Sequence, residues 1–516
     1  MGFLERLGFK AKNKALPKNS GYGNYGASYA RKSLSAWVTA GRSADEDIVD
    51  NIETLRERSR DLFMGAPLAT GALKTLRTNV VGSGLALNPQ IDAEFLGLSD
   101  DEARAWVSNV QREWRLWAET TECDIERRQT FYQIQSLVLL SALQNGDVFI
   151  TLPVVRRPNC PYDLRISLIE ADRICNPDYI PTGKNILGGV EVGAYSEPVA
   201  YWVAKNHPGA YPRSIDTSSQ SWKRVPAFGA QSGRRNIIHV MTDLERPAQR
   251  RGVPVLAPVI ESLKQMSRYA DAELTAAVVT AMFTVFVRSQ SPQTPLGSMF
   301  DPAMDKDPNA YELGNGAIVG LAEGEDISIA DPKRPNSGFS AFIEAMGRQV
   351  GAALEIPYEV LIKNFTSSYS ASRGALLEAW KMFRMRRDWL ASTFCQPIYE
   401  EWLREAVLKG RVSAPGYLDD PAIRAAWSNA EWFGDSQGQL DPLKEAQAAQ
   451  LRVYEGFSTR EREAAELTGM KFEEIVATRR REEQVLKDSG LVEDPAEQTR
   501  DEQTKDENQT EGDSDE

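Results

Sequence analysis

The stretch PVLAPVIESLKQMSRYADAELTAAVVTAMFTV, from Pro254 to Val285, decides how this chain is organised. Pro254 and Pro258 stand at its start, where proline is tolerated because the first amides of a helix have no partner within the helix. No further proline or glycine occurs before Val285, and apolar residues recur at helical spacing. The pattern predicts one long helix from about Val255 to about Val285.

A second helix is predicted from Gly338 to Glu355, and a small insert separates the two. Residues 286–335 are rich in proline and glycine and hold two short β-like runs, Ala317–Val319 and Ile327–Ile329. One side of the second helix would carry these apolar residues: Phe339, Phe342, Met346 and Val350. Pro357 then breaks the helix. Two helices that flank a small β insert therefore form the middle of the chain.

The first half of the chain mixes helical and β-like patterns. Helical spacing covers Asp45–Asn79, where Ser43 and Glu46 form a capping-box pattern, and covers residues 100–145 as well. One stripe of the later region consists of Trp106, Val110, Trp114 and Trp117. An aromatic stripe at this spacing is typical of a buried core. Short β-like runs follow at Val148–Leu152, Leu164–Leu168, Ala200–Val203 and Ile237–Val240.

The last third of the chain begins with a polar segment. Residues 363–370, KNFTSSYS, have the composition of a loop, and a strong helix is predicted from about Ala371 to Leu408. Further helices are predicted after Asp441–Pro442, after a second capping-box pattern at Ser458 and Glu461, and near Lys471.

The net charge of −13 is concentrated near the ends of the chain. Glu493–Glu516 holds eleven acidic and two basic residues, a net −9 that leaves −4 for the rest, and its polar composition predicts a disordered tail. The first 35 residues hold seven basic residues and one acidic residue, and we expect a flexible arm there. A nearly neutral middle argues against tight binding to DNA phosphates but leaves a sliding contact open.

Sequence motifs of enzymes are missing. There is no GxxxxGK[ST] phosphate loop, no GxSxG and no HExxH. Gly21-x-Gly23-x-x-Gly26 matches a dinucleotide fingerprint in letters only, because no strand precedes it. Asp172, Asp178 and Glu191 are interpreted as surface acids rather than as ligands of a two-metal nuclease. We predict no enzymatic activity, no metal and no cofactor.

Cysteine and histidine usage points the same way. Cys123, Cys160, Cys175 and Cys395 show no CxxC spacing, which indicates reduced, mostly buried thiols in a protein made in the cytosol. Two histidines argue against a histidine-rich zinc site. The longest mostly apolar run, Leu274–Val287, has 14 residues, whereas a membrane span needs about 20.

Several segments, found in one order along the chain, carry a family resemblance. They are Arg58–Leu62, Thr78–Leu85, Trp114–Ala118, Cys123–Asp124, Gly146–Phe149, Leu168–Arg173, Glu245–Pro254, Gly324–Asp326, Pro332–Pro335, Tyr369–Glu378, Asp441–Glu445 and Gly456–Arg460. Together they span about residues 45–485 and resemble the lambda-type portal family of tailed bacteriophages. No single segment is a chemical motif, and the ordered set makes the match specific.

The resemblance implies an α+β, mostly helical portal fold. Subunits of this family, usually twelve, form a ring with wing, stem, clip and crown regions around a central channel. For this chain it implies a basic flexible arm at 1–40, the wing at 41–250, the first stem helix at 251–285, the clip at 286–335, the second stem helix at 336–356, a channel loop at 357–372, a long helix returning to the wing at 373–410, a helical crown at 411–490 and a disordered acidic tail at 491–516.

The resemblance also implies a function. The chain would be a subunit of the portal vertex, made in the host cytoplasm and built into the virion, and it would form the channel through which DNA is packaged and ejected. The implied partners are further copies of the chain, double-stranded DNA in transit, the terminase motor, the major capsid and scaffolding proteins, and head-completion or tail-connector proteins, with no membrane. It could also help to nucleate capsid assembly.

The residues implied to line the channel are Lys363, Asn364, Phe365, Thr366, Ser367, Ser368, Tyr369 and Ser370. Hydroxyl and amide groups can exchange hydrogen bonds with a moving phosphate backbone without holding it. Lys363 would add a weak attraction that salt screens.

Three other classes stay open at the level of sequence. The first is a different structural head or connector protein that lacks a DNA channel. The second is a terminase-like ATPase or nuclease, against which the missing phosphate-loop lysine argues. The third is a pore in the host membrane, against which the short apolar runs argue.

Overall fold

The computed structural model describes residues 31–37, 39–179, 185–209, 221–281, 285–289, 325–329, 338–365, 368–436, 442–468 and 472–489. Within these residues the fold is a mixture of helices and small antiparallel sheets. Four sequence expectations lie outside them: most of the N-terminal arm with its Gly21–Gly26 pattern, the Ala317–Val319 strand, most of the clip, and the acidic tail.

The N-terminal helices begin where the capping pattern predicts. Helix α1 (Ala44–Ile48) carries a complete capping box in which Ser43 and Glu46 bond reciprocally. Helices α2 (Ile52–Gly65) and α3 (Pro67–Val80) follow, and Pro67 opens α3 at a position that suits proline. The buried face of α3 packs into the main core through Ala69, Leu73 and Leu76.

The tryptophan stripe is buried, as predicted. It lies on α5 (Asp100–Ala118), which follows the short α4 (Ala93–Leu96) and begins at a second capping box formed by Ser99 and Glu102. Trp114 is 2% exposed and packs edge-on against rings of α6 (Phe131–Asn145) and α11 (Gln396–Leu408). The aromatic core thus joins segments that are almost 300 residues apart.

Two antiparallel sheets carry most of the predicted β-like runs. In the first, β2 (Asp147–Thr151) lies between β3 (Ser167–Ile169) and β8 (Ile237–Met241). The second has the order β4 (Ile186–Leu187), β5 (Val190–Val192), β6 (Pro198–Ala204) and β7 (Trp222–Pro226). Phe149, Tyr201 and Val203 contribute to a smaller core between the two sheets.

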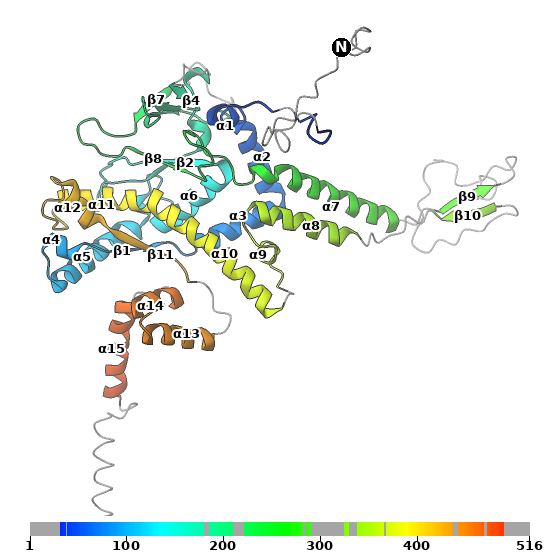
Figure 1. Ribbon diagram of the computed structural model, residues 1–516. Helices are drawn as coiled ribbons and strands as arrows, with labels where there is room; N and C mark the ends of the chain where they lie inside the picture. The colour runs from blue at the N-terminus through cyan, green and yellow to red at the C-terminus, as the bar shows by residue number, and fades with distance from the viewer. Residues whose placement is uncertain are drawn as a thin grey trace, which may run out of the picture.

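The two long helices in the middle of the chain form a protruding hairpin. Helix α7 (Ile260–Ala281) and helix α8 (Phe339–Ala353) lie side by side and extend away from the rest of the molecule (Figure 1). Tyr269 of α7 packs its ring against Phe339 and Phe342 of α8. Beyond the hairpin, β9 (Val285–Ser289) pairs antiparallel with β10 (Glu325–Ile329), which contains the predicted Ile327–Ile329 run.

After the hairpin, one long rod returns to the rest of the molecule. Helix α9 (Tyr358–Ile362) is followed by α10 (Tyr369–Leu390), a π-helical turn (Ala391–Cys395) and α11 (Gln396–Leu408). The predicted helix from Ala371 to Leu408 is therefore present and starts two residues earlier. The segment 357–372, expected as a loop, instead holds α9 and the first turn of α10.

The C-terminal part differs from the expected all-helical segment at 411–490. Helix α12 (Pro421–Ser428) and strand β11 (Ala430–Phe433) pack on the core, where β11 pairs with β1 (Ala86–Pro89). The remaining helices are α13 (Pro442–Tyr454), α14 (Arg460–Thr468) and α15 (Phe472–Asp488). The predicted cap at Ser458 is wrong: the Thr459 hydroxyl accepts the Arg462 amide at 3.2 Å and starts α14 one residue later.

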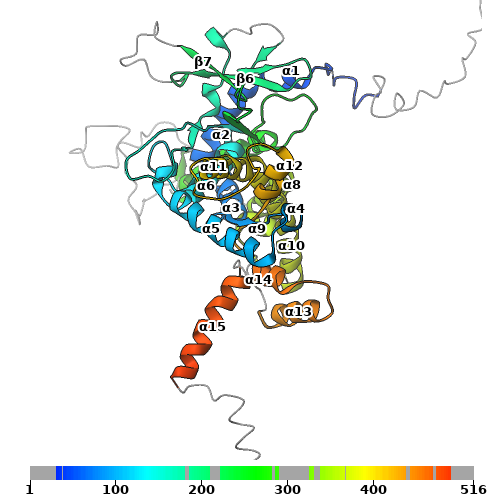
Figure 2. The same ribbon diagram turned by 90° about the vertical axis from the view of Figure 1, so that its left-hand side faces the viewer.

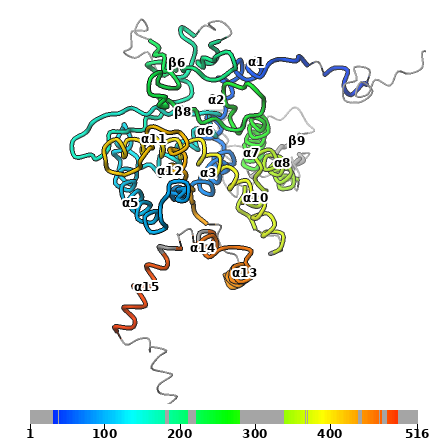
Figure 3. Tube along the Cα trace, turned by 60° about the vertical axis from the view of Figure 1, so that its left-hand side comes forward, coloured from blue at the N-terminus to red at the C-terminus, as the bar shows by residue number. Residues whose placement is uncertain are grey.

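We call α7 and α8 the hairpin, α13 to α15 the C-terminal helices, and the other described elements except β9 and β10 the body. Figure 2 and Figure 3 show the C-terminal helices beneath the body, with α15 pointing away from it. Among the described helices, none is both long and apolar enough to cross a membrane.

Candidate channel segment and body–hairpin network

The segment predicted to line a channel is held at both ends. On one side, Val360 and Leu361 of α9 are buried in the main core and fix the start of the segment at the base of the hairpin (Figure 1). Gly347 of α8 leaves room for the Tyr358 ring, because a Cβ there would lie 2.8 Å from it. On the other side, the Ser368 side chain caps α10 by accepting the Ala371 amide. The described residues on both sides of positions 366 and 367 are therefore held by α9 and by the cap of α10.

The eight residues predicted to line the channel do not all lie in a loop. Lys363 ends α9 in the left-handed conformation, with φ of 57°, and its amide donates to the Glu359 carbonyl. Lys363, Asn364 and Phe365 are exposed, and Phe365 is 47% exposed despite its apolar ring. Tyr369 and Ser370 belong to the first turn of α10 rather than to a loop. Thr366 and Ser367 lie outside the described residues.

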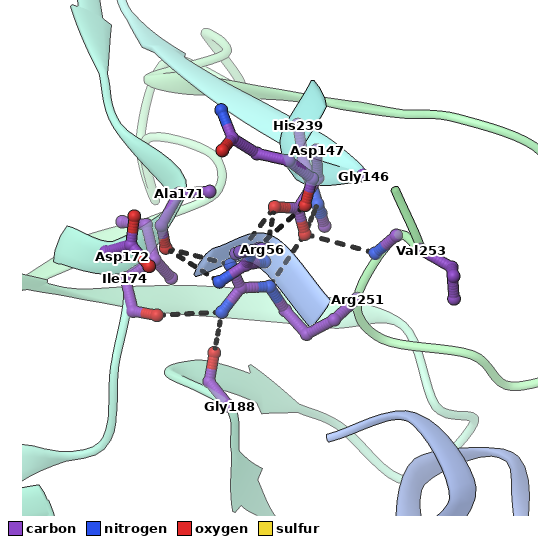
Figure 4. A network of polar contacts seen from close by, with 12 residues as sticks. Arg56, Gly146, Asp147, Ala171, Asp172, Ile174, Gly188, His239, Arg251 and Val253 are labelled. Carbon is purple, nitrogen blue, oxygen red and sulfur yellow. Dashed lines mark hydrogen bonds and ion pairs between the residues drawn. The ribbon is translucent and has the colours of Figure 1, made fainter. Parts of the chain in front are cut away.

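A buried ionic network, which the sequence did not point to, lies where the hairpin joins the body. Its centre is Asp147 at the start of β2, whose side chain is fully buried (Figure 4). Arg56 of α2 donates to one carboxylate oxygen at 2.8 Å, and Arg251, just before the hairpin, donates to both at 2.7 and 3.1 Å. The Gly252 amide and His239 of β8 complete the shell at 3.1 and 3.3 Å. One carboxylate thus joins four separate segments.

Arg251 also bonds to the backbone of the segments around the two sheets of the body. Its guanidinium donates to the carbonyls of Ile174 at 2.7 Å, Gly188 at 2.6 Å and Ala171 at 2.9 Å. Since an arginine side chain offers five N–H donors in a rigid fork, one residue can hold Asp147 and three carbonyls together. The network therefore fixes the connector Arg250–Pro254, from which the hairpin starts, onto the body.

Gly146 and Gly252 allow the connector Arg250–Pro254 to lie directly against the chain at the start of β2. Gly146 has φ of 90°, and a Cβ on it would lie 2.3 Å from the Gly252 carbonyl oxygen. A Cβ on Gly252 would in turn lie 1.9 Å from the Gly146 oxygen. Thr242 spans the pair, because its hydroxyl bonds to the carbonyls of Gly146 at 2.7 Å and of Val253 at 2.9 Å. A side chain at either glycine would push the connector away from β2.

Burial and charge act in opposite directions on the ionisable groups of the network. Burial raises the pKa of Asp147, but Arg251, Arg56 and the hydrogen bonds outweigh it and hold that pKa well below its usual range. Burial and the like charge of Arg251 lower the pKa of Arg56 to about 10 against the pull of Asp147. Burial also lowers the pKa of His239, which Asp147 only partly opposes. At neutral pH the network holds one carboxylate, two guanidinium ions and a neutral imidazole.

A second group of ionisable residues borders the network. Ligand atoms of Glu170, Asp172 and His207 lie within 4.8 Å of one another, a spacing that could suit a metal ion. Arg60 of α2 already forms an ion pair with Asp172 and approaches Glu170 to 3.6 Å. Because a guanidinium ion supplies the positive charge there, we interpret the group as an ion-pair cluster.

The three acids considered at the level of sequence do not come together. Asp172 lies in that ion-pair cluster, and Glu191 forms a two-point ion pair with Arg224 at 2.8 Å for each contact. Asp178 lies in the short 3-10 turn Pro177–Tyr179. Asp172 and Glu191 are thus partly exposed acids that pair with arginines, and Asp178 is exposed, so the three do not form the carboxylate cluster of a two-metal nuclease.

These features define a structural class of protein, an α+β body locked onto a protruding helical hairpin. Comparison with known proteins identifies the family. Residues 30–387 match the model of phage portal proteins of the lambda family. Portal protein B of Escherichia phage lambda is 27% identical over 501 residues, and the portal protein of Escherichia phage N15 is 26% identical over 500 residues; each match covers 92% of this chain and 92% of the relative. A chain from the neck of an empty gene transfer agent particle, computed with C6 symmetry, is 14% identical, with a TM-score of 0.44 over 85% of this chain and 98% of that chain.

Since the family model matches more than half of the sequence, this chain belongs to the lambda family of phage portal proteins. It is a subunit of the portal vertex, the connector between the head and the tail of a bacteriophage particle. Three of the segments that carried the resemblance meet in space, since Gly146–Phe149, Leu168–Arg173 and Glu245–Pro254 all contribute to the Asp147 network.

Proposed function

We propose that copies of this chain, twelve in number, close into a ring around a channel through which double-stranded DNA passes during packaging and ejection. In this assembly the body corresponds to the wing, the hairpin to the stem, β9 and β10 to part of the clip, and the C-terminal helices to the crown. Identical interfaces related by a closing rotation produce such rings.

The observation that carries the proposal is the exposed hairpin. Two helices cannot cover each other on all sides, and Leu274, Val278 and Phe342 remain 67%, 48% and 42% exposed. Apolar side chains on a protruding hairpin gain free energy when a neighbouring hairpin covers them. A ring of hairpins would bury these side chains in every subunit at once.

Residues 363–370 are proposed to line this channel. Lys363, Asn364 and Phe365 are exposed at the end of α9, and Ser368 caps the start of α10. A short segment anchored by α9 and capped at α10 could present polar groups to DNA while keeping its own position. One lysine per subunit would add a salt-screened attraction to each phosphate that passes.

The ring is tested by the mass of the purified assembly in native mass spectrometry, together with electron micrographs. We expect a closed oligomer with a central opening. A species that remains monomeric at micromolar concentration across several salt conditions would exclude the proposal. A closed assembly without an opening would favour the alternative, a head or connector protein that lacks a DNA channel.

The channel segment is tested by shortening it by two residues and measuring the DNA content of the resulting heads. We expect rings to assemble but heads to package or retain less DNA. The matched control removes Ala230 and Gln231 from an exposed turn of the body. If heads with the shortened segment fill and stay filled like those of the wild type, the segment is only a connector.

We further propose that the clip end of the ring binds the terminase motor first and the head-completion proteins later, while the body contacts the capsid and scaffolding proteins. The strands β9 and β10 beyond the hairpin would sit at the end of the ring farthest from the body, where a motor could dock. Binding of purified terminase to the intact ring, and its loss when residues 290–324 are replaced by a short linker, would test this docking site.

A further inference from the structure

One edge of strand β11 is not paired with another strand. In the part of the chain that the structure describes, β11 pairs with β1 alone. Directly beside β11, the Gln90 amide donates to the Asn429 carbonyl at 2.8 Å. Hydrogen-bonded and non-bonded pairs alternate along an antiparallel ladder, so every second residue of β11 turns its backbone amide and carbonyl away from β1. These residues are Ala430 and Trp432, and their backbone groups bond to no other described residue.

This unpaired edge borders a groove between the body and the C-terminal helices. The groove has a volume of about 1020 Å³ and is lined by parts of α10, β11, α13 and α14. Every residue from Ala430 to Ser436 lines it. Since successive side chains of a strand point to opposite faces, an unbroken run of lining residues means that the strand meets the groove with its edge. An extended chain in the groove would therefore find unpaired amides and carbonyls to bond to.

The charges in the groove favour a basic occupant. Seven acidic and six basic residues line it, and Arg387 donates to three backbone carbonyls. Among the described residues, Glu431 and Glu461 form no ion pair, and both are exposed. Four of the basic residues are already paired with acids of the groove, in the pairs Arg373–Glu445, Arg384–Glu466, Arg452–Glu463 and Arg462–Glu466. A cationic segment is therefore attracted, whereas the acidic tail and nucleic-acid phosphates are repelled.

The N-terminal arm contains a segment of matching chemistry. Residues 9–16, FKAKNKAL, contain neither glycine nor proline, and Pro17 follows them. The lysines recur at every second position, as Lys10, Lys12 and Lys14. In an extended chain they would lie on one side, and the small residues between them would lie on the other. The segment thus combines positive charge with the alternation of an edge strand.

We propose that residues 9–16 of the N-terminal arm dock in this groove as an additional strand on the unpaired edge of β11. The backbone of the segment bonds to Ala430 and Trp432, and its lysines lie near Glu431 and Glu461. Strand addition of this kind derives its affinity from main-chain hydrogen bonds and its specificity from alternate side chains. Leu377 of α10, which lines the groove and is 45% exposed, offers an apolar contact to the other side of the segment.

The length of the arm limits which groove it occupies. The chain between residues 16 and 31 spans at most about 50 Å when it is fully extended. The occupied groove therefore belongs to the same copy of the chain or to a directly neighbouring copy. Because α13 and α14 form one wall of the groove, a docked arm would also help to hold the C-terminal helices against the body.

The first test follows hydrogen exchange of β11 in the full-length protein and in Lys12→Pro. Proline removes an amide donor and is poorly tolerated within a paired strand, so the variant should not dock. We expect the amides of Ala430 and Trp432 to exchange several-fold faster in this variant than in the wild type. Ala27→Pro, in the same arm but outside the segment, is the control and should behave like the wild type. Equal exchange in all three proteins would overturn the proposal.

A second test identifies the occupant. A synthetic peptide of residues 7–18, added to the Lys12→Pro protein, should restore the protection of β11. A peptide of residues 493–504, taken from the acidic tail, should not. Protection by the acidic peptide alone would mean that the tail occupies the groove and that the arm does not.

A third test examines the charges. Glu431→Lys places a positive charge beside the proposed lysines and should lose the protection of β11 that the arm provides. Glu455→Lys makes the same change at an exposed residue outside the groove and should keep it. The same exchange rates in both variants would contradict the proposed contact between the lysines and Glu431. These measurements concern the arm and the groove, so a negative result would leave the proposed ring and channel unaffected.

Discussion

At the scale of single residues, the body depends on two kinds of buried side chain. Trp114 stands at the centre of an aromatic cluster, with ring centroids of Phe131 and Trp402 both 5.1 Å away. Asp147 stands at the centre of an ionic cluster that contains Arg56 and Arg251. The aromatic side chains stabilise the fold through the apolar area that they remove from water. The carboxylate stabilises it because its absence would leave two guanidinium ions buried without a counter-charge.

Replacing Trp114 by alanine should destabilise the subunit by roughly 3–5 kcal/mol, because the ring is buried and its removal leaves a cavity. The measurement is the free energy of unfolding in urea. Leu116→Ala, at a site on the same helix that is 47% exposed, is the control and should have little effect. A near-zero change for Trp114→Ala, combined with the loss of a binding partner, would mean that the stripe is a surface site.

Replacing Asp147 by asparagine should cost about 3–5 kcal/mol, since the amide keeps the shape of the side chain but leaves Arg56 and Arg251 without a counter-charge. The matched control is Asp61→Asn, which removes an exposed carboxylate 3.5 Å from Lys264 and should cost at most about 1 kcal/mol. Similar losses for both variants would show that the buried network contributes no more than a surface ion pair.

The network should also make the subunit less stable in mild acid. Burial lowers the pKa of His239 in the folded state, so below about pH 6.5 the unfolded chain takes up a proton that the folded chain does not. Stability therefore falls as the pH falls from about 6.5, by up to about 1 kcal/mol at pH 5.5. The low pKa of Asp147 adds a further loss below about pH 4.

Urea unfolding of the wild type and of His239→Gln, at pH 7.0 and at pH 5.5, checks this expectation. The glutamine amide can still donate to Asp147 but does not titrate, so the variant should lose less stability between the two pH values. An identical loss in both proteins would assign the acid sensitivity to another group.

At the scale of elements, the C-terminal helices and the rod formed by α10 and α11 are attached to their neighbours by different kinds of contact. Phe394, Tyr399 and Trp402 of the rod are fully buried in the main core. The C-terminal helices instead meet α10 through the ion pairs Arg384–Glu466 at 3.7 Å and Arg373–Glu445 at 4.0 Å, both partly exposed. Such pairs contribute little and are screened by salt.

Backbone amides of α13 to α15 should therefore exchange with deuterated solvent faster than those of α5 and α11, and still faster at high salt. Hydrogen exchange followed by mass spectrometry measures this in the intact assembly. Equal protection of α14 and α11 would mean that contacts between subunits, rather than the ion pairs to α10, hold the C-terminal helices in place.

At the scale of the whole molecule, the acidic tail and the hairpin differ in charge and in apolar surface. The acidic tail carries most of the net negative charge, whereas the exposed apolar residues Leu274, Val278 and Phe342 lie on the hairpin. In a ring, the tails of neighbouring subunits would repel one another, while the hairpins would attract. Assembly is therefore expected to depend on the hairpin and not on the tail.

Deleting residues 493–516 should leave both folding and assembly unchanged, because this segment has almost no apolar residue to bury. Thermal unfolding and the mass of the assembly are the measurements. A large drop in the midpoint, or loss of the oligomer, would show that the tail packs against the protein.

The sequence alone determined the features that depend on neighbours along the chain. The capping box at Ser43, the buried tryptophan stripe of α5 and the two helices of the hairpin all follow from local spacing, and the structure confirms them. Helix caps and amphipathic stripes are local because each helical turn contacts only the next, three or four residues away.

Only the tertiary structure decided which distant residues meet. Arg56, Asp147 and Arg251 are 91 and 104 residues apart, and nothing in the spacing of any one segment indicates that they share a site. The pairing of β11 with β1 was likewise decided by the tertiary structure. A helical region was expected there, but packing on the core outweighs the local preference of the segment. Arg165 reads as an ordinary basic residue of a β-like run, and only the fold buries it. Local periodicity predicts which face of a helix or strand a residue occupies. The distant residues that it contacts depend on how the helices and strands pack together.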